Sequence, residues 1–336
     1  MKLQVSHSPH VRDKATTQSI MRDVVIALLP ATFAGWYYFG IRAVLITLVS
    51  FVSCVGFEYL CRRVMKRNNT ISDLSAVVTG LLLAMNLPVS LPLYMVVVGA
   101  AFAIVVVKQM FGGIGNNFVN PAIAARIFLV ICFPKAMTSW VVRAGAWYSL
   151  KSVDAVSSAT PLTQFQGADA PSMWDLFIGN TAGCIGEVCI LALLIGAAYL
   201  FVRHVIQPWI PLAYLGTFLI VVFFFGKANV FHFSGNLATL DGWQVLFHEC
   251  CYMLLSGGLV LGAFFMATDY VTSPLTVKGK LLFGLGCGIL TFLIRYYSNM
   301  AEGVSFSILL MNILTPHIDD WTMGKPFGEV KENVKA

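Results

Sequence analysis

Residues 79–128 read TGLLLAMNLPVSLPLYMVVVGAAFAIVVVKQMFGGIGNNFVNPAIAARIF, and residues 256–314 read SGGLVLGAFFMATDYVTSPLTVKGKLLFGLGCGILTFLIRYYSNMAEGVSFSILLMNIL. Each stretch has an apolar, glycine-containing span that ends in a polar break with a proline, near Asn86 in the first and near Asp269 in the second. A full span, a polar loop and a short final span follow in both. Interrupted spans at matching positions of two halves are typical of inverted-repeat membrane proteins with a site near the midplane. The alternative is that proline and glycine are simply common in membrane helices.

The composition excludes a soluble protein. Of the 336 residues, 58% are hydrophobic and only 11% are charged, whereas soluble domains carry about 25% charged residues. Several apolar runs have the roughly 20 residues that a bilayer crossing needs. We therefore predict an all-α polytopic membrane protein of about ten transmembrane helices, arranged as a 5+5 inverted repeat with interrupted helices. The predicted spans are 20–40, 41–61, 74–88, 92–110, 120–134, 176–202, 208–226, 243–268, 280–297 and 304–318.

The distribution of basic residues predicts the orientation of these spans. Most of the 22 Lys and Arg fall in segments that share a side with the N-terminus, and the run from Arg62 to Arg67 is the densest. Because cytoplasmic loops carry the excess of basic residues, both termini are predicted to be cytoplasmic, in the cell inner membrane. The charge thus reports topology rather than nucleic-acid binding. The predicted divisions are an N-terminal segment 1–19, a first repeat 20–134, an outer loop 135–175, a second repeat 176–318 and a tail 319–336.

The outer loop carries the most informative motif. Residues 154–161 read DAVSSATP, a run suited to phosphoester attachment of flavin mononucleotide (FMN) to Thr160. A threonine hydroxyl is a weak nucleophile and needs a transferase to activate it, and small neighbours leave that enzyme room. A nearby serine hydroxyl can hydrogen-bond the phosphate. An ordinary polar loop is the alternative for SSAT alone. The residues assigned to this site are Asp154, Ser157, Ser158, Ala159 and Thr160.

With this motif the whole chain resembles the RnfD family, the D subunit of the Rnf complex, which is a ferredoxin:NAD oxidoreductase. That family is similar to the B subunit of the Na⁺-translocating NADH:quinone reductase, and its flavinylation signal is Asp-x-x-Ser/Thr-Gly/Ser-Ala-Thr. Ser158 stands where many members have glycine, a small-for-small change. The resemblance implies a fold akin to ammonium and urea transporters, and a flavin transferase for maturation. It also implies partner subunits, including an FMN-bearing G subunit and iron–sulfur subunits.

A second flavin site is predicted in the loop 112–121, which reads GGIGNNFVNP. Its glycines permit close backbone approach, and its amides can pair with the edge of a planar heterocycle. In the resembled family the matching Asn-x-x-Asn-Pro is associated with noncovalent riboflavin, so Asn117 and Asn120 are the candidates. The alternative is a helix start with an asparagine cap and Pro121 in the first turn. Both interpretations can hold at once.

Ionisable residues within the spans are candidates for function, because burying a charge in a membrane is costly. Asp269, at the second break, is the first choice for an ion-sensitive position, although a purely structural role suits several of the others. The eight cysteines lack metal-site spacing, so we predict apolar packing and no metal. A cluster shared with a partner subunit is the open alternative. The other ionisable candidates are Glu58, Arg126, Glu187, His248, Glu249, Arg295 and Glu302.

Two functions fit these features. The first is a membrane redox subunit that passes electrons between flavins and is coupled to Na⁺ or H⁺ transport. NAD and ferredoxin would react on partner subunits, since the chain has no P-loop, Rossmann glycine pattern or ferredoxin-type cysteine run. The second is a secondary transporter or channel for a small solute, which the repeat and the broken spans suit equally well. The motif at Thr160 discriminates between the two functions, because a transporter has no use for a flavinylation signal.

Overall fold

The computed structural model describes residues 15–140, 161–164, 171–226, 240–298 and 302–324, and within these ranges the secondary structure is helical. The first half of the chain contains α1 (Thr17–Phe39), α2 (Ile41–Val64), η1 (Ile71–Asp73), α3 (Ser75–Met85), α4 (Leu93–Ala101), η2 (Phe102–Gln109), α5 (Pro121–Cys132) and α6 (Pro134–Met137). The second half contains α7 (Pro161–Gln164), α8 (Met173–Ile178), α9 (Ile190–Val202), α10 (Trp209–Phe225), α11 (Leu240–Leu255), α12 (Leu259–Leu261), η3 (Gly262–Met266), α13 (Val277–Tyr297) and α14 (Val304–Thr322).

The described helices are compatible with a multi-pass membrane protein. Three of them, α1, α2 and α13, are long and apolar enough to cross a bilayer. A fourth crossing would be the pair Val245–Leu255 and Leu259–Met266, whose axes are bent by 61°. The helices α3, α5, α9 and α10 and the continuous α4–η2 are apolar but shorter. The count of ten spans and the inverted repeat stay predictions.

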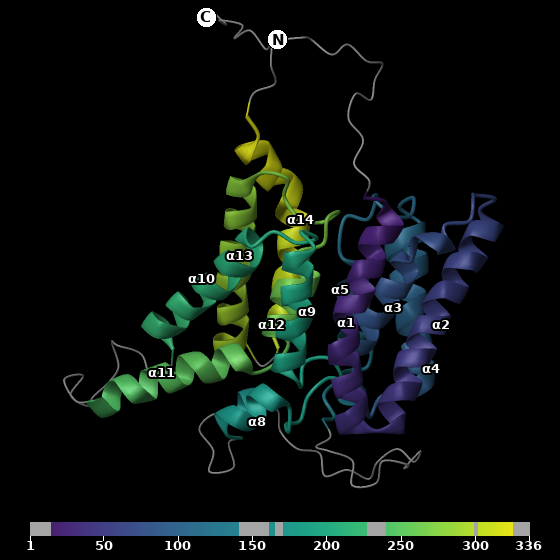
Figure 1. The fold of residues 1–336 in the computed structure, drawn as a ribbon. Coiled ribbons are helices and arrows are strands. Elements are labelled where there is room, and N and C mark those ends of the chain that lie inside the picture. Colours follow the sequence, from purple (N-terminus) through teal and green to yellow (C-terminus); the bar gives the residue numbers. More distant parts are fainter. Residues whose placement is uncertain (1–14, 141–160, 165–170, 227–239, 299–301, 325–336) are drawn as a thin grey trace, which may run out of the picture.

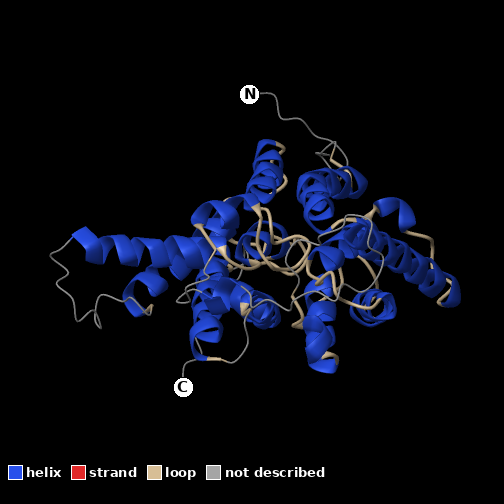
Figure 2. Ribbon diagram, turned by 90° about the horizontal axis from the view of Figure 1, so that it is seen from below, coloured by secondary structure: helices blue, strands red, loops and turns tan. Residues whose placement is uncertain are grey.

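Several helices end inside the bundle rather than at its surface. Figure 1 shows α1 beginning and α14 ending on the same side, with α8 at the opposite end. In the perpendicular view of Figure 2, loop segments meet near the centre of the array of helices. Lipid cannot satisfy the backbone groups of such loops, so they need protein around them. Their position among the helices surrounds these loops with protein.

The predicted span 176–202 is helical only at its two ends, in the last residues of α8 and in α9. Residues 179–189 are irregular, and α9 begins at Ile190. The amides of Ile185 and Gly186 donate instead to the carbonyls of Leu87 and Met85, at 3.2 and 2.9 Å. This segment therefore supplies hydrogen bonds to the broken end of α3, which a continuous helix could not do.

The second half of the chain contains one interruption more than the prediction. The break that the sequence predicts near Asp269 is present, because η3 ends at Met266 and α13 begins only at Val277. The chain also bends earlier, between Leu255 and Leu259, which the pattern does not predict. Gly257 adopts a φ of +67° there, a conformation that favours glycine. The predicted short final span is longer than expected, because α14 continues past Pro316 to Thr322.

Candidate functional site

A large cavity opens on the side of the bundle where α1 begins. The space between its walls is about 810 Å³, part of which is open solvent at the mouth. Apolar side chains of α1, α3 and η3 form much of its wall. Its polar lining includes Ser75, Thr79, Lys108, Asn117, Asn120 and Asp269.

Asn120 caps the N-terminus of α5. Its side-chain oxygen accepts hydrogen bonds from the amides of Ala122 and Ile123, at 3.0 and 3.4 Å, and Pro121 occupies the first turn. Its Nδ2 donates to the carbonyl of Met266 at 3.4 Å, which ties α5 to the end of η3. The capping interpretation is confirmed: the cap uses the side-chain oxygen, and the side-chain nitrogen makes the separate bond to Met266.

Asn117 is the less committed of the two predicted amides. It is 8% exposed and lines the cavity, and no hydrogen bond joins its side chain to another described residue. A buried amide costs free energy unless it is paired. Asn117 therefore offers a donor and an acceptor to whatever fills the cavity.

One wall of the cavity contains a buried ion pair. The Lys108 Nζ lies 2.7 Å from Oε2 of Glu58 and 2.7 Å from the Ser75 hydroxyl. The other carboxylate oxygen of Glu58 accepts from Thr70 at 2.9 Å. In the sequence, Lys108 counts only among the basic residues that predict topology. A lysine at the end of one span and a glutamate within an earlier span are the signal that identifies such a pair.

Asp269 also lines the cavity, and it comes from the second half of the chain. Its carboxylate accepts a hydrogen bond from the Thr272 hydroxyl at 3.2 Å. Asn117 and Asp269, predicted separately from sequence, are thus brought to one cavity. The walls carry one buried cation–carboxylate pair and one additional carboxylate.

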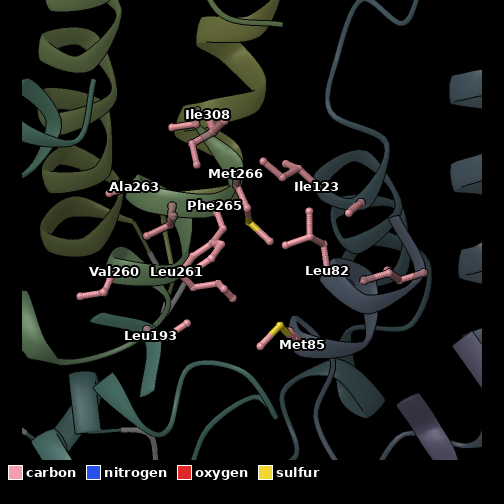
Figure 3. Close-up of a cluster of buried hydrophobic side chains, with 14 of the residues drawn as sticks. Leu82, Met85, Ile123, Leu193, Val260, Leu261, Ala263, Phe265, Met266 and Ile308 are labelled. Atoms are coloured by element: carbon pink, nitrogen blue, oxygen red, sulfur yellow. The ribbon is translucent and has the colours of Figure 1, made fainter. Parts of the chain in front are cut away.

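An apolar plug closes the inner end of the cavity. Figure 3 shows Leu82 of α3, Ile123 of α5, and Phe265 and Met266 of η3 pointing toward one another. Leu82 and Phe265 also line the cavity. All four side chains are buried, and Arg126 and its partners do not line the cavity.

Beyond the plug, Arg126 organises a second polar network. Its Nη1 donates to Oδ1 of Asn86 at 3.0 Å and to the Ser305 hydroxyl at 3.1 Å, and its Nη2 is ion-paired with Glu302. Both charged side chains are more than nine-tenths buried. The network joins residues from both halves of the chain.

Cys184 and Glu187 complete this network. The carboxylate of Glu187 accepts from the Cys184 amide at 2.6 Å. The ligand atoms of Cys184, Glu187 and Glu302 lie within 4.8 Å of one another. The guanidinium of Arg126 contacts two of these three residues, and its positive charge opposes a metal ion there. The contacts of Arg126 therefore favour its ion pair with Glu302 over a metal site.

A smaller cavity lies at the end of the bundle near α8. It is lined by Pro161, Leu162, Glu187, Gly257 and Glu302, among others. Pro161 follows the predicted flavin attachment site directly in the chain. The site residues Asp154, Ser157, Ser158, Ala159 and Thr160 themselves lie outside the described residues.

Comparison with known proteins gives matches over almost the whole chain. The sequence profile of the NQR2, RnfD, RnfE family matches residues 4–328. The chain is 42% identical over 343 aligned positions to the D subunit of a Na⁺-translocating ferredoxin:NAD⁺ oxidoreductase complex from Acetobacterium woodii, covering 100% of this chain and 99% of that protein. It is 40% identical to the D subunit of a proton-translocating ferredoxin:NAD⁺ oxidoreductase complex from Clostridium ljungdahlii, with 96% of each covered. The D subunit of an ion-translocating oxidoreductase complex from Stutzerimonas stutzeri is 36% identical, with 94% and 93% covered.

Proposed function

The chain belongs to the NQR2, RnfD, RnfE family, and from this premise we propose that it is the flavin-bearing membrane subunit of an ion-translocating ferredoxin:NAD⁺ oxidoreductase complex. The observation that carries the proposal is its 42% identity, end to end, to the D subunit of a complex with that name. Electrons would pass between ferredoxin and NAD through partner subunits, an FMN-bearing G subunit and iron–sulfur subunits among them. Both ends of the chain would lie on the cytoplasmic side of the inner membrane.

Two flavins are part of this proposal. The first is FMN, joined by a phosphoester to Thr160 by a flavin transferase, as the motif DAVSSATP supports. The second is riboflavin, held noncovalently in the large cavity. Asn117 lines that cavity, and its side-chain amide has no hydrogen-bond partner among the described residues, so it can pair with a planar heterocycle that has donor and acceptor edges. A bound flavin supplies one- and two-electron chemistry, and the protein supplies position and electrostatics.

The covalent flavin is tested by replacing Thr160, whose hydroxyl would carry it, with alanine. The chain is expressed together with the flavin transferase, and denaturing gels are viewed under ultraviolet light. We expect a fluorescent band in the wild type and none in Thr160→Ala, because no other residue should accept the phosphoryl group. Thr163→Ala removes the next threonine along the chain and should stay fluorescent. A fluorescent band in Thr160→Ala would contradict the assignment.

The cavity flavin is tested by Asn117→Ala. Removing a buried amide that pairs with the ligand costs about 1–3 kcal/mol, so we expect riboflavin to bind roughly tenfold more weakly or worse. The measurement is the amount of riboflavin released from the denatured, purified complex and identified by chromatography. Asn116→Ala is the matched control, since Asn116 is the exposed neighbour in the same loop. Equal riboflavin in both variants would remove Asn117 from the site.

The coupling ion would use the polar groups on either side of the plug, with Asp269 as the ion-sensitive position. Similarity does not choose between Na⁺ and H⁺, because the relative at 42% identity is named for sodium and the one at 40% for protons. The alternative of a solute transporter without a redox role has less support, since these full-length relatives are named as oxidoreductase subunits.

A further inference from the structure

Arg62, near the end of α2, is a buried cation without an acceptor. The residue is 8% exposed, and its Nε is enclosed and has no hydrogen-bond partner. No hydrogen bond or ion pair joins the rest of its guanidinium to another described residue. An arginine side chain carries five N–H donors and keeps its charge in proteins. Burying such a charge without a partner is costly, so an anion from outside the described residues is expected beside it.

The carboxylate of Glu58, one helical turn before Arg62, does not supply the missing acceptor. Its Oε2 accepts a hydrogen bond from Nζ of Lys108 at 2.7 Å, and its Oε1 accepts one from the Thr70 hydroxyl at 2.9 Å. Arg62, Lys108 and Glu58 are all buried. These three side chains thus contain two cations and one carboxylate, which leaves one buried positive charge uncompensated.

Arg62 lies where α2 reaches the end of the bundle. Figure 1 shows the end of α2 and the beginning of α1 on the same side. The residues that follow Arg62 are exposed, and three of them are basic: Arg63, Lys66 and Arg67. Basic clusters next to a membrane helix on the cytoplasmic side attract anionic lipid headgroups. The charge around Arg62 is therefore suited to a lipid phosphate.

Apolar side chains are exposed beside this buried cation. The loop after η2 passes close to Arg62, because a Cβ added at Gly113 would overlap its Nη2. Gly113 has a φ of +100°, which favours glycine. Met110 and Phe111, just before this glycine, are 64% and 51% exposed, and Val64 of α2 is 73% exposed. The surroundings of Arg62 thus combine a charge with apolar surface, as a ligand with a charged head and apolar tails requires.

We propose that Arg62 binds the phosphate of an anionic phospholipid, on the side of the membrane that the basic residues predict to be cytoplasmic. A guanidinium can donate two parallel N–H···O bonds to a phosphodiester. The exposed Arg63, Lys66 and Arg67 attract the net negative charge of the headgroup. The acyl chains lie along the exposed apolar side chains of α2 and of the loop after η2. The proposal depends on the place of the chain in a membrane and not on either flavin.

The test is photo-crosslinking in the purified, delipidated complex. Phosphatidylglycerol with a diazirine in its acyl chain is added in detergent, and crosslinked peptides of this chain are quantified by mass spectrometry. We expect crosslinks on the peptides that contain Val64 or Met110 in the wild type. They should be at least about tenfold fewer in Arg62→Met, because hydrogen bonds between charged groups are lost. Phosphatidylcholine with the same diazirine should crosslink there more weakly, since its headgroup has no net charge.

Arg203→Met is the matched control. Arg203 follows α9 and is paired with Asp23, near the beginning of α1, at 3.2 Å. The substitution removes the same charge at the same end of the bundle, but it removes a guanidinium that already has its acceptor. Crosslinks should therefore stay at the wild-type level. Equal losses in both variants would mean that the lipid responds to surface charge alone, and the site at Arg62 would be overturned.

Thermal unfolding separates a bound lipid from a role of Arg62 in folding. Because a ligand stabilises the folded state that binds it, phosphatidylglycerol should raise the unfolding midpoint of the wild-type complex by about 2–4 °C and that of Arg62→Met by less than about 1 °C. Without lipid, Arg62→Met should unfold no lower than the wild type, since it removes an uncompensated buried charge. Should Arg62→Met fail to assemble, the neutral but polar Arg62→Gln takes its place.

Other outcomes would overturn the proposal. Crosslinks that persist in Arg62→Met would place the lipid elsewhere. Crosslinks that excess inorganic phosphate displaces would assign the site to free phosphate. Loss of a partner subunit from the lipid-free Arg62→Met complex would assign the missing anion to a carboxylate of that subunit. None of these results affects the fluorescent band that tests Thr160, so the proposed function is judged separately.

Discussion

The two interruptions of the bundle are stabilised by different chemistry. At the end of α3, the side-chain amide of Asn86 donates to the carbonyl of Leu82 at 2.6 Å. The backbone amides of residues 185 and 186 donate to the carbonyls of Leu87 and Met85. Between α11 and α12, the free carbonyls accept from Arg295, and Gly257 makes the turn. Both interruptions leave backbone groups that lipid cannot pair. The first therefore depends on a network of side chain and backbone, and the second on one guanidinium and one backbone conformation.

This difference predicts unequal sensitivity. The side chain of Asn86 is also the partner of Arg126, whose cation is paired with Glu302. Loss of a member of the first network thus reaches residues of both halves. Replacing Gly257 at the second break affects only the backbone conformation there and the side chains next to it.

The largest effect is expected for Arg126→Met. The substitution leaves the carboxylate of Glu302, of which 8% is exposed, without its cation. Removing one partner of a buried ion pair costs about 3–5 kcal/mol, and Asn86 loses a donor as well. We expect a large fall in the midpoint of thermal unfolding of the purified complex, followed by intrinsic fluorescence, or failure to assemble.

Arg203→Met is the control for this prediction. Arg203 is paired with Asp23 at 3.2 Å, but 51% of its side chain is exposed. An ion pair of that exposure contributes roughly 0–1 kcal/mol. If both substitutions lowered the unfolding midpoint equally, the buried network would not be the stabilising feature of the first interruption.

The sequence was sufficient for the features that depend on composition and local pattern. The long apolar runs predicted α1, α2 and α13 within a few residues, and Asn120-Pro121 predicted the start of α5. Conversely, residues 179–189 are apolar enough to be taken for a helix, and only their pairing with Met85 and Leu87 explains why they are not. That pairing joins distant parts of the chain, which no local pattern reveals.

The candidate site divides in the same way. Asn117, Asn120 and Asp269 could be named from sequence because an amide or carboxylate near a membrane span is conspicuous. Their meeting in one cavity could not be predicted, because it depends on how the two halves of the chain pack together. The role of Lys108 in the wall could not either, because it depends on the packing of η2 against α2, which carries Glu58. The motif around Thr160 remains a prediction from sequence alone.

A smaller effect is expected for Gly257→Ala, which tests the second interruption. Alanine at a φ of +67° costs roughly 1–2 kcal/mol, and its Cβ would press on Leu162 and Arg295. The thermal midpoint of the complex should fall modestly, with assembly preserved. Gly216→Ala is the matched control: it lies within α10 with no atom within 4 Å of an added Cβ, so alanine should be neutral or stabilise the helix by up to about 1 kcal/mol.

The comparison of the two interruptions depends on whether alanine lowers the thermal midpoint at position 257 but not at position 216. If Gly257→Ala behaved like Gly216→Ala, the backbone at the α11–α12 break would accept a side chain. Arg295 alone would then stabilise the break, and both interruptions would depend on an arginine in the same manner. A loss at Gly257 with none at Gly216 assigns the second break to backbone conformation, whereas Asn86 at the first break has a φ of −93° and needs no glycine.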